Sequence, residues 1–318
     1  MSTASLDTPT SPDAPAAAAT PAPLAPAAPR KGPSRRVLAC LAATWLVWGS
    51  TYLAIKFALP SFPPFVQMGS RFLTAGVILA VWMRWRRAAP WPTARQWVHA
   101  LVIGSLMLGG GMGGTAVAEQ TVGSGLVVAF IAVSPLMIAA LNLLWKVVPR
   151  PLELAGIALG LAGVLLLTRG QGFGASPGGL AAILTATLCW ASGSVLSQRL
   201  LPLAPGAMGF ASEMLAGGAV LMLISLSQGE TIVLPLQPLA VGAWLYLVVF
   251  GSLVAFNAYM VLLAETPAAV ASSYSFVNPV IAMLLGVGLA GEQISGHEWL
   301  AAAVVLGGVV LLLMGRRR

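Results

Sequence analysis

Long apolar runs dominate this sequence and constrain its fold more than any other feature. After residue 36 they recur with lengths near the roughly 20 residues that a helix needs to cross a bilayer. Ten membrane-spanning helices are predicted, at 37–59, 65–83, 97–117, 124–145, 152–168, 178–199, 206–226, 240–263, 268–290 and 297–314. Only 8% of the residues are charged, against about 25% in soluble domains. The chain is therefore predicted to be an all-α membrane protein, because a β-barrel would show alternating segments of about ten residues instead.

The basic residues fall almost entirely on one side of the predicted spans. Arg169 alone lies on the far side, and Lys56 and Arg71 lie within spans. The other 14 of the 17 lie on the side of the N-terminus: Arg30, Lys31, Arg35, Arg36, Arg84, Arg86, Arg87, Arg95, Lys146, Arg150, Arg199, Arg316, Arg317 and Arg318. Because Lys and Arg gather in cytoplasmic loops, both termini are predicted to be cytoplasmic. The net charge of +8 then reflects topology, and no nucleic-acid partner is expected.

The N-terminal segment, 1–36, has a different composition. Residues 1–33 contain 8 Pro and 10 Ala, too little apolar area to offset the chain entropy lost on folding. A disordered tail that ends in basic residues is predicted there. Cys40 and Cys189 lie inside apolar runs, so neither a disulfide nor a metal framework is expected.

The membrane region divides into two similar halves, 37–170 and 171–318. Matching positions keep their order at offsets of 142 to 147 residues: Trp48-Gly49-Ser50 with Trp190-Ala191-Ser192, Ser70-Arg71 with Ser212-Glu213, Gly104-Ser105-Leu106 with Gly251-Ser252-Leu253, Ala118-Glu119 with Ala264-Glu265, Pro135 with Pro279, and Gly163-Val164 with Gly308-Val309. Each half has five predicted spans, an odd number, so the second must enter the membrane from the opposite side. Inverted repeats of this kind commonly build secondary transporters with a substrate site near the midplane.

Several short motifs together resemble the EamA-type members of the drug/metabolite transporter superfamily. They are Trp48-Gly49-Ser50-Thr51-Tyr52, Pro63-Pro64, Arg71-Phe72, Ala118-Glu119, Ser134-Pro135, Asn257-Ala258-Tyr259, Asn278-Pro279, Gly291-Glu292 and Glu298-Trp299-Leu300. The resemblance covers about residues 37–314 and implies two inverted five-helix repeats that move small metabolites, amino acids or drug-like solutes, usually outward. Many members carry a Gly-Glu pair after the fourth span, where this chain has Trp145-Lys146.

Two charged residues within the spans are candidate substrate-binding residues. Arg71 and Glu213 each lie roughly 10 Å inside the predicted membrane boundary, counted at 1.5 Å per residue. A charge at the centre of a membrane helix costs about 2.5–3.5 kcal/mol on insertion scales, so it invites a functional explanation. A direct salt bridge between them and two separate contacts with solute are both open. Anchoring of neighbouring helices is the alternative role for each.

Aromatic and polar residues recur on matching helix faces and predict a chiefly apolar cavity with a few hydrogen-bonding groups. The expected lining residues are Trp48, Tyr52, Ser134, Trp190, Asn257, Tyr274 and Asn278. Ordinary helix packing is the alternative explanation. Pro135 and Pro279 each remove a backbone donor within a span and are candidate gating residues, with a static kink as the alternative.

Together these features predict a secondary or facilitative transporter of the bacterial inner membrane, working by alternating access, and an exporter by the family resemblance. A passive channel and an importer are the alternatives. The few ionisable groups favour a neutral, zwitterionic or amphipathic solute, and Glu213 is a candidate for proton coupling. No cofactor, metal or catalytic activity is expected, since His99 and His297 lie at span ends and no phosphate-binding Gly-Lys loop occurs. Apart from solute and the lipid bilayer no partner is expected, and fused repeats make an oligomer unnecessary.

Overall fold

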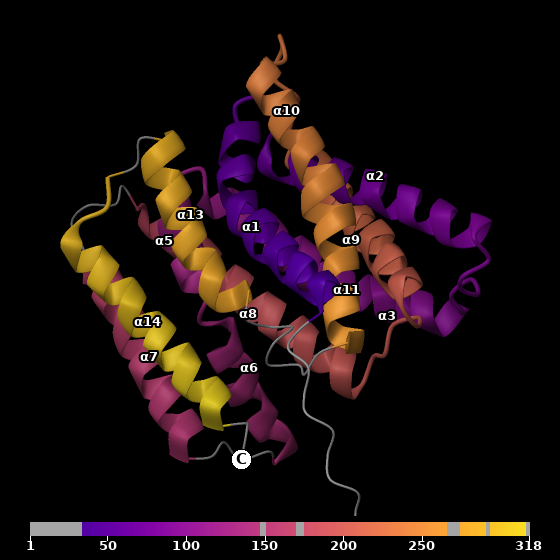
Figure 1. The fold of residues 1–318 in the computed structure, drawn as a ribbon. Helices are drawn as coiled ribbons and strands as arrows, with labels where there is room; N and C mark the ends of the chain where they lie inside the picture. Colours follow the sequence, from indigo (N-terminus) through magenta and orange to yellow (C-terminus); the bar gives the residue numbers. More distant parts are fainter. Residues whose placement is uncertain (1–33, 147–150, 170–174, 266–273, 291–292, 316–318) are drawn as a thin grey trace, which may run out of the picture. The chain divides into compact units, whose positions relative to one another are not determined.

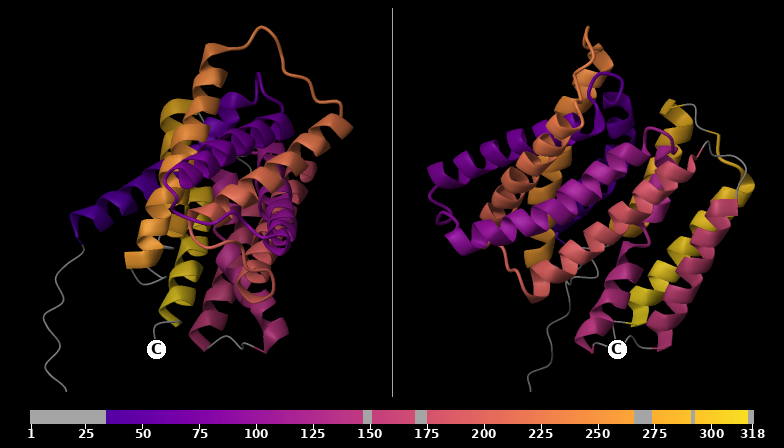
Figure 2. Two further views of the ribbon diagram at one scale, coloured as in Figure 1. Left: turned by 90° about the vertical axis from the view of Figure 1, so that its right-hand side faces the viewer. Right: turned by 180° about the vertical axis from the view of Figure 1, so that it is seen from behind.

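The computed structural model describes residues 34–146, 151–169, 175–265, 274–290 and 293–315. Across these residues the secondary structure is helical and contains no strand. The predicted disordered tail at 1–33, the Gly291-Glu292 motif and the basic end at 316–318 lie outside the described residues. Contacts group Arg35–Arg318 into one unit, shown from three sides in Figures 1 and 2.

Helices occupy each of the ten predicted ranges, and several are interrupted. The first half contains α1 (Arg35–Ala58), α2 (Pro64–Trp85), α3 (Ala94–Gly104), the π-helix η1 (Ser105–Gly113), α4 (Gly114–Ala118), α5 (Ser124–Ile131), α6 (Ser134–Asn142), the 3₁₀ turn η2 (Leu143–Trp145) and α7 (Pro151–Arg169). The second half contains α8 (Pro177–Arg199), α9 (Ala207–Ser227), α10 (Pro238–Tyr246), the π-helix η3 (Leu247–Val254), α11 (Ala255–Glu265), α13 (Tyr274–Ala290) and α14 (Gly296–Gly315).

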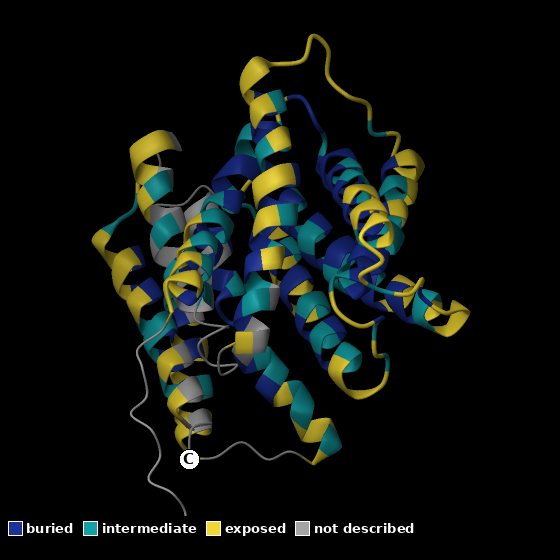
Figure 3. Cartoon of the chain, turned by 45° about the vertical axis from the view of Figure 1, so that its right-hand side comes forward, coloured by how far each residue is buried: buried dark blue, intermediate teal, exposed yellow. Residues whose placement is uncertain are grey.

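Six helical segments among the described residues are long and apolar enough to cross a membrane. They are Arg35–Ala58, Pro64–Trp85, Ala94–Ala118, Pro177–Arg199, Ala207–Ser227 and Pro238–Tyr259. Buried residues gather where helices face one another, while exposed residues lie on the outward faces (Figure 3). Many of those exposed residues are large and apolar, such as Trp85 at 74% and Leu226 at 72% exposure. The all-α membrane class is thus confirmed for these residues. Crossing by the other four ranges, and the side of each terminus, stay predictions.

The starts of the helices are explained by local sequence. Proline occupies the first turn of α2, α6, α8 and α10, where its missing N–H leaves no helical hydrogen bond unmade. Reciprocal side-chain and backbone hydrogen bonds between Thr93 and Gln96 cap α3. A long-range cap holds α2, whose Phe65 and Val66 amides donate to the Glu230 carboxylate at 3.2 and 2.8 Å. That carboxylate faces the positive end of the α2 dipole.

Helices α2 and α9, which hold matching positions of the two halves, pack along each other through small residues. A Cβ added to Gly76 would lie 3.0 Å from Cγ of Leu215, and one added to Gly218 would lie 3.0 Å from Cγ of Leu73. The offset of 142 residues that pairs Ser70-Arg71 with Ser212-Glu213 also pairs Leu73 with Leu215 and Gly76 with Gly218, so the contact is reciprocal. Contacts of this form arise around a two-fold axis. Because Leu73 lies beside Gly218 and Gly76 beside Leu215, the two helices run antiparallel.

Helices α7 and α14 repeat this pattern and lie side by side in Figures 1 and 2. A Cβ on Gly163 would lie 2.7 Å from the Val305 amide nitrogen, and one on Gly308 would lie 2.5 Å from that of Gly160. Gly163 and Gly308 are again paired by the sequence comparison. Two matched pairs of helices therefore make reciprocal, antiparallel contacts. Close backbone approach of this kind is typical of small residues at membrane helix interfaces.

Both third helices of the halves contain a π-helical segment, η1 and η3. The predicted ranges 97–117 and 240–263 treated these helices as regular. A π-helix widens the turn and is often found at functional sites. Gly104-Ser105 stands at the start of η1, and the matching Gly251-Ser252 lies within η3.

Candidate functional site

Arg71 is a charged residue held in the interior of the structure by contacts from two helices. Helix α2 buries it to 2% exposure. Its Nε donates to the Ser252 hydroxyl at 3.0 Å, its Nη1 approaches the Met68 sulfur at 3.7 Å, and its guanidinium lies 4.8 Å from the Phe72 ring centroid. In the described part of the chain no carboxylate forms an ion pair with it. The fold therefore supplies this buried cation with hydrogen-bonding and aromatic neighbours but no neutralising charge.

The π-helix η3 brings Arg71 next to α1. A Cβ on Gly251 would lie 3.0 Å from Nη2 of Arg71 and 3.1 Å from Cγ2 of Thr51, so only glycine permits this approach. The carbonyl oxygen of Gly251 accepts a hydrogen bond from Nε1 of Trp48 at 3.2 Å. One short stretch, Gly251-Ser252, therefore joins the guanidinium of α2 to the indole of α1.

Five aromatic rings from four helices pack into a cluster beside this stretch. The aromatic cluster consists of Trp48 on α1, Phe210 on α9, Phe256 and Tyr259 on α11, and Tyr274 on α13. Ring centroids are 4.6 Å apart between Trp48 and Tyr274, 5.3 Å between Trp48 and Tyr259, and 5.4 Å between Trp48 and Phe256. These are the separations of ordinary edge-on and tilted aromatic contacts. In this structure the cluster residues fill the space among themselves.

Tyr52 lies one helical turn after Trp48 on α1. Glu119 caps the C-terminal end of α4 and is 3% exposed. Tyr52 also packs against the apolar core around Val127 and Phe130.

Glu213 lies on α9 with 5% exposure, and among the described residues no Lys or Arg pairs with it. Since Leu73 lies beside Gly218 on the antiparallel pair, Arg71 lies opposite position 220. That position is seven residues from Glu213, roughly 10 Å along the helices. The direct salt bridge, left open by the sequence, does not form. The two charges are separate sites.

The remaining predicted lining residues do not all gather at Arg71. Ser134 is buried and donates to the Ile131 carbonyl oxygen. Asn278 is buried, and its amide nitrogen can donate to the carbonyl oxygens of Trp45 and Tyr274. Asn257 is exposed and donates to the Leu253 carbonyl oxygen. Trp190 lies against Gly111 of η1, where a Cβ would be 3.3 Å from its ring.

The two candidate gating prolines stand in different backbone settings. The predicted fourth span breaks at Ala132-Val133, and Pro135 lies in the first turn of the helix that follows, α6. The predicted interruption at Pro135 is present: the proline has no amide to donate to the Ile131 carbonyl oxygen, which accepts a hydrogen bond from the Ser134 hydroxyl instead. A gating role for Pro135 stays a prediction. Pro279 lies within the uninterrupted α13. The symmetry predicted for the two positions is therefore not seen in the backbone.

Sequence reasoning missed Ser252, Phe256, Phe210 and the placement of Tyr259. Phe256 and Tyr259 are three residues apart, on one face of a helix, and that spacing could have indicated an aromatic face opposite Trp48. Ser252 carries no comparable signal. Its contact with Arg71 depends on the π-helical turn, which positions it across 181 residues of sequence.

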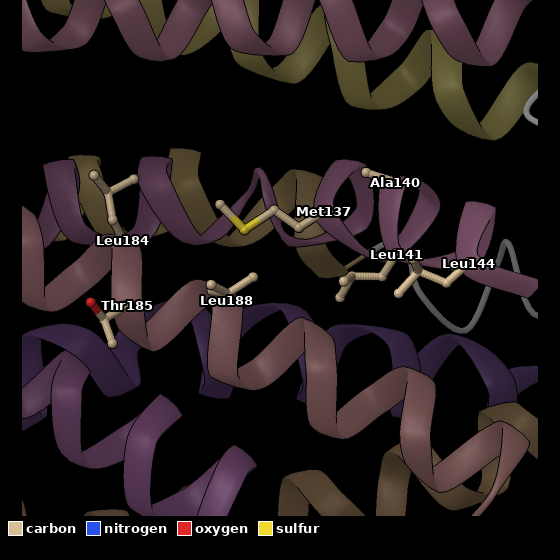
Figure 4. Close-up of a pocket in the computed structure, with 7 residues that line it drawn as sticks. All are labelled: Met137, Ala140, Leu141, Leu144, Leu184, Thr185 and Leu188. Carbon is tan, nitrogen blue, oxygen red and sulfur yellow. The ribbon is translucent and has the colours of Figure 1, made fainter.

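Two open pockets occur away from Arg71. One of about 460 Å³ lies between α6 and α8 and is lined by Met137, Ala140, Leu141, Leu144, Leu184, Thr185 and Leu188 (Figure 4). The other, of about 430 Å³, lies at the end of α2 and includes Arg84, Trp85 and Trp91. Among the described residues no group of three or more His, Cys, Asp or Glu could hold a metal ion.

Comparison with known proteins identifies the family. The model of the EamA-like transporter family matches the chain twice, over residues 36–169 and 177–314. The inner membrane transporter YedA of Escherichia coli K12, named as uncharacterized, is 42% identical over 285 residues, covering 88% of this chain and 91% of the relative.

More distant proteins match this chain over a similar length. Protein PecM of Dickeya dadantii is 27% identical, covering 86% of this chain and 92% of its own length. A crystal structure with 24% sequence identity has a TM-score of 0.60 and covers 88% of this chain and 98% of its own, which shows a shared fold. With its apolar helices, the chain is a multi-pass inner-membrane protein. The chain belongs to the EamA-like transporter family.

Proposed function

We propose that the protein is a secondary or facilitative exporter of a small metabolite, amino acid or drug-like solute, working by alternating access between two inverted repeats. The single observation that carries the proposal is the reciprocal, antiparallel packing of α2 on α9 and of α7 on α14. Matched helices that run in opposite directions around a two-fold axis are what an inverted repeat requires. The two matches of the family model, one per half, support the same division into 37–170 and 171–318.

The proposed solute site lies between Arg71 and the aromatic cluster. Arg71 supplies a buried positive charge with no carboxylate partner in the described part of the chain, and Trp48, Tyr259 and Tyr274 supply apolar surface with polar ring atoms. A solute that carries one anionic group beside an apolar portion would satisfy both. Because the rings fill the space in this structure, we propose that solute enters a conformation in which α1 and α13 part. Pro135 and Pro279 are the proposed gating residues.

Glu213 is proposed as the proton-coupling residue. A carboxylate buried in a membrane helix without a basic partner is stable chiefly in its protonated form, and giving up the proton requires water or solute nearby. Flux through the wild-type protein should therefore vary with pH, and Glu213→Gln should remove that variation. The matched control is Glu230→Gln, at a carboxylate outside the apolar helical segments whose hydrogen bonds from the Phe65 and Val66 amides the Gln oxygen can keep. If pH-dependent flux survives Glu213→Gln, another group carries the coupling.

The experiment that tests the function begins with resistance profiles. Cells that overexpress the chain and cells that lack it are compared over a panel of metabolites and antimicrobial compounds, and a solute that separates them is carried into proteoliposomes. An exporter should saturate with solute concentration and should exchange internal for external labelled solute faster than it gives net flux. Flux that rises linearly with concentration, without exchange, would mean that the protein is a passive channel.

A further inference from the structure

The end of α2 carries a pocket that is independent of the proposed solute site. It has a volume of about 430 Å³ and is lined by Val77, Ala80, Val81, Arg84, Trp85, Trp91 and Leu215. Five of these residues lie on α2 at spacings of three, one, three and one, which places them on a single helical face. Leu215 of α9 forms the second wall, and Trp91 comes from the connection to α3.

The lining of the pocket is apolar along its whole length, and a charged residue, Arg84, stands at one end. Val77 and Val81, at one end, are 51% and 62% exposed apolar side chains, so they face the hydrocarbon of the bilayer. Arg84 lies in the last turn of α2 at the other end, roughly 10 Å along the helix from Val77. Trp85 and Trp91, 74% and 52% exposed, border that end. Tryptophan favours the level of the lipid headgroups, so this end lies at the membrane surface.

Positive charge at the surface end is not neutralised. Arg84 lines this end, Arg86 and Arg87 follow it directly after α2, and Arg95 lies at the start of α3, while no Asp or Glu occurs between residues 64 and 118. Within the described residues none of these arginines forms an ion pair, although Arg86 lies 5.1 Å from the Trp82 ring centroid. The acid on the neighbouring helix, Glu213, is buried and two residues from Leu215, and so points away from it on α9.

We propose that this pocket, lined by Arg84, Trp91 and the Val77–Val81 face, binds one anionic glycerophospholipid. An acyl chain lies along Val77, Ala80, Val81 and Leu215, and the phosphate accepts hydrogen bonds from Arg84. Lipid is the occupant because the apolar end opens toward hydrocarbon while the basic end lies at headgroup level. Basic pockets between membrane helices commonly bind anionic headgroups. The pocket between α6 and α8 has no charged lining residue, so it offers no such selectivity.

The test uses the full chain, purified in detergent and titrated with palmitoyl-oleoyl phosphatidylglycerol or phosphatidylcholine, with bound lipid counted by native mass spectrometry. Wild-type protein should retain the anionic phosphatidylglycerol in preference to phosphatidylcholine. Arg84→Gln should weaken its binding roughly fivefold, the effect of one basic residue beside an anionic surface, while Arg84→Lys should retain most of it. Arg95→Gln, which removes an equal charge outside the pocket, is the matched control.

Four results would overturn the proposal. Equal retention of the two lipids would show that charge plays no part, and equal losses in Arg84→Gln and Arg95→Gln would show only diffuse attraction to the basic loop. The third concerns the apolar wall: Val81→Asn should lower the occupancy of both lipids, and no change would place the acyl chain elsewhere. A mass corresponding to two copies of the chain without lipid would assign the pocket to a protein contact. Because Val81, Arg84 and Arg95 are exposed, these variants should fold.

Discussion

At the scale of single residues, the two halves have diverged most at their buried charges. Arg71 and Glu213 occupy matching positions of α2 and α9, yet they carry opposite charges. The matching serines Ser252 and Ser105 also differ, in their hydrogen-bond partners. Ser252 accepts a hydrogen bond from Arg71, whereas the matching Ser105 donates to the Leu101 carbonyl oxygen of its own helix at 2.7 Å. The two halves therefore share their order of helices but differ in the polar contacts that their buried residues make.

Ser252 should therefore matter for transport in a way that Ser105 does not. Removing the hydroxyl with Ser252→Ala leaves Arg71 without its hydrogen-bond acceptor, and bonds to charged groups contribute about 1.5–3 kcal/mol. We expect the transport rate in proteoliposomes to fall roughly tenfold for Ser252→Ala and further for Arg71→Gln. Ser105→Ala should stay within about twofold of wild type. Equal rates for the two serine variants would show that the Arg71 contact has no part in transport.

At the scale of helices, packing rests on close approach of backbones. Gly218 and Gly76 meet Leu73 and Leu215, and Gly308 meets Gly160, at distances that leave no room for a side chain. Small residues take this role in membranes because apolar side chains gain little by leaving lipid, so association depends on tight contact. The glycines of α2, α7, α9 and α14 are thus part of the helix interfaces between the two halves.

Gly218→Ala should destabilise the interface between α2 and α9. The added methyl would lie 3.0 Å from the Leu73 amide nitrogen, and overpacking of this kind typically costs about 1–3 kcal/mol. A lower Tm in detergent is expected, with a similar decrease for the reciprocal Gly76→Ala. Gly242→Ala is the matched control, because nothing lies within 4 Å of its added methyl and alanine favours helix. A Gly218→Ala protein as stable as Gly242→Ala would contradict close packing at this contact.

At the scale of the whole molecule, the first helix of each half contacts the third helix of the other half, with one polar contact at an end of each pair. Arg36 at the start of α1 pairs with Glu265 at the end of α11 at 2.8 Å. In the other half, Ser176, the N-cap of α8, donates to Thr121, just after α4, at 2.8 Å. Inverted repeats would place these two contacts at opposite membrane faces, as gates that open alternately.

Cross-linking either contact should stop transport. In a chain carrying Cys40→Ala and Cys189→Ala, the pair Arg36→Cys with Glu265→Cys, or the pair Thr121→Cys with Ser176→Cys, is joined by a short cleavable thiol reagent. Flux should be lost in each case because both ends must open in turn, and cleavage of the reagent should restore it. The single-cysteine variants treated with the same reagent are the controls. Full flux through a cross-linked pair would remove that contact from the gating scheme.

The opposite membrane orientation of the two halves can be measured directly. The α2–α3 and α9–α10 connections are equivalent in the two halves, so inverted repeats require them on opposite sides of the membrane. In the same cysteine-free background, Gln228→Cys should react with an impermeant maleimide added to intact cells. Ala88→Cys should react only after the membrane is opened. Both positions are exposed, so access of reagent does not limit the result. Labelling of both from one side would refute the inverted repeat and the transport mechanism built on it.

The sequence alone determined the membrane class, the positions of the helices and the family. Those features depend on local quantities, namely the length of apolar runs and the order of short motifs. They can therefore be inferred without any knowledge of tertiary contacts. The π-helices and the pairing of Arg71 with Ser252 were decided only by tertiary structure. The physical reason is that a buried polar group takes whichever partner the surrounding helices bring within about 3 Å, and apolar periodicity carries no record of that distance.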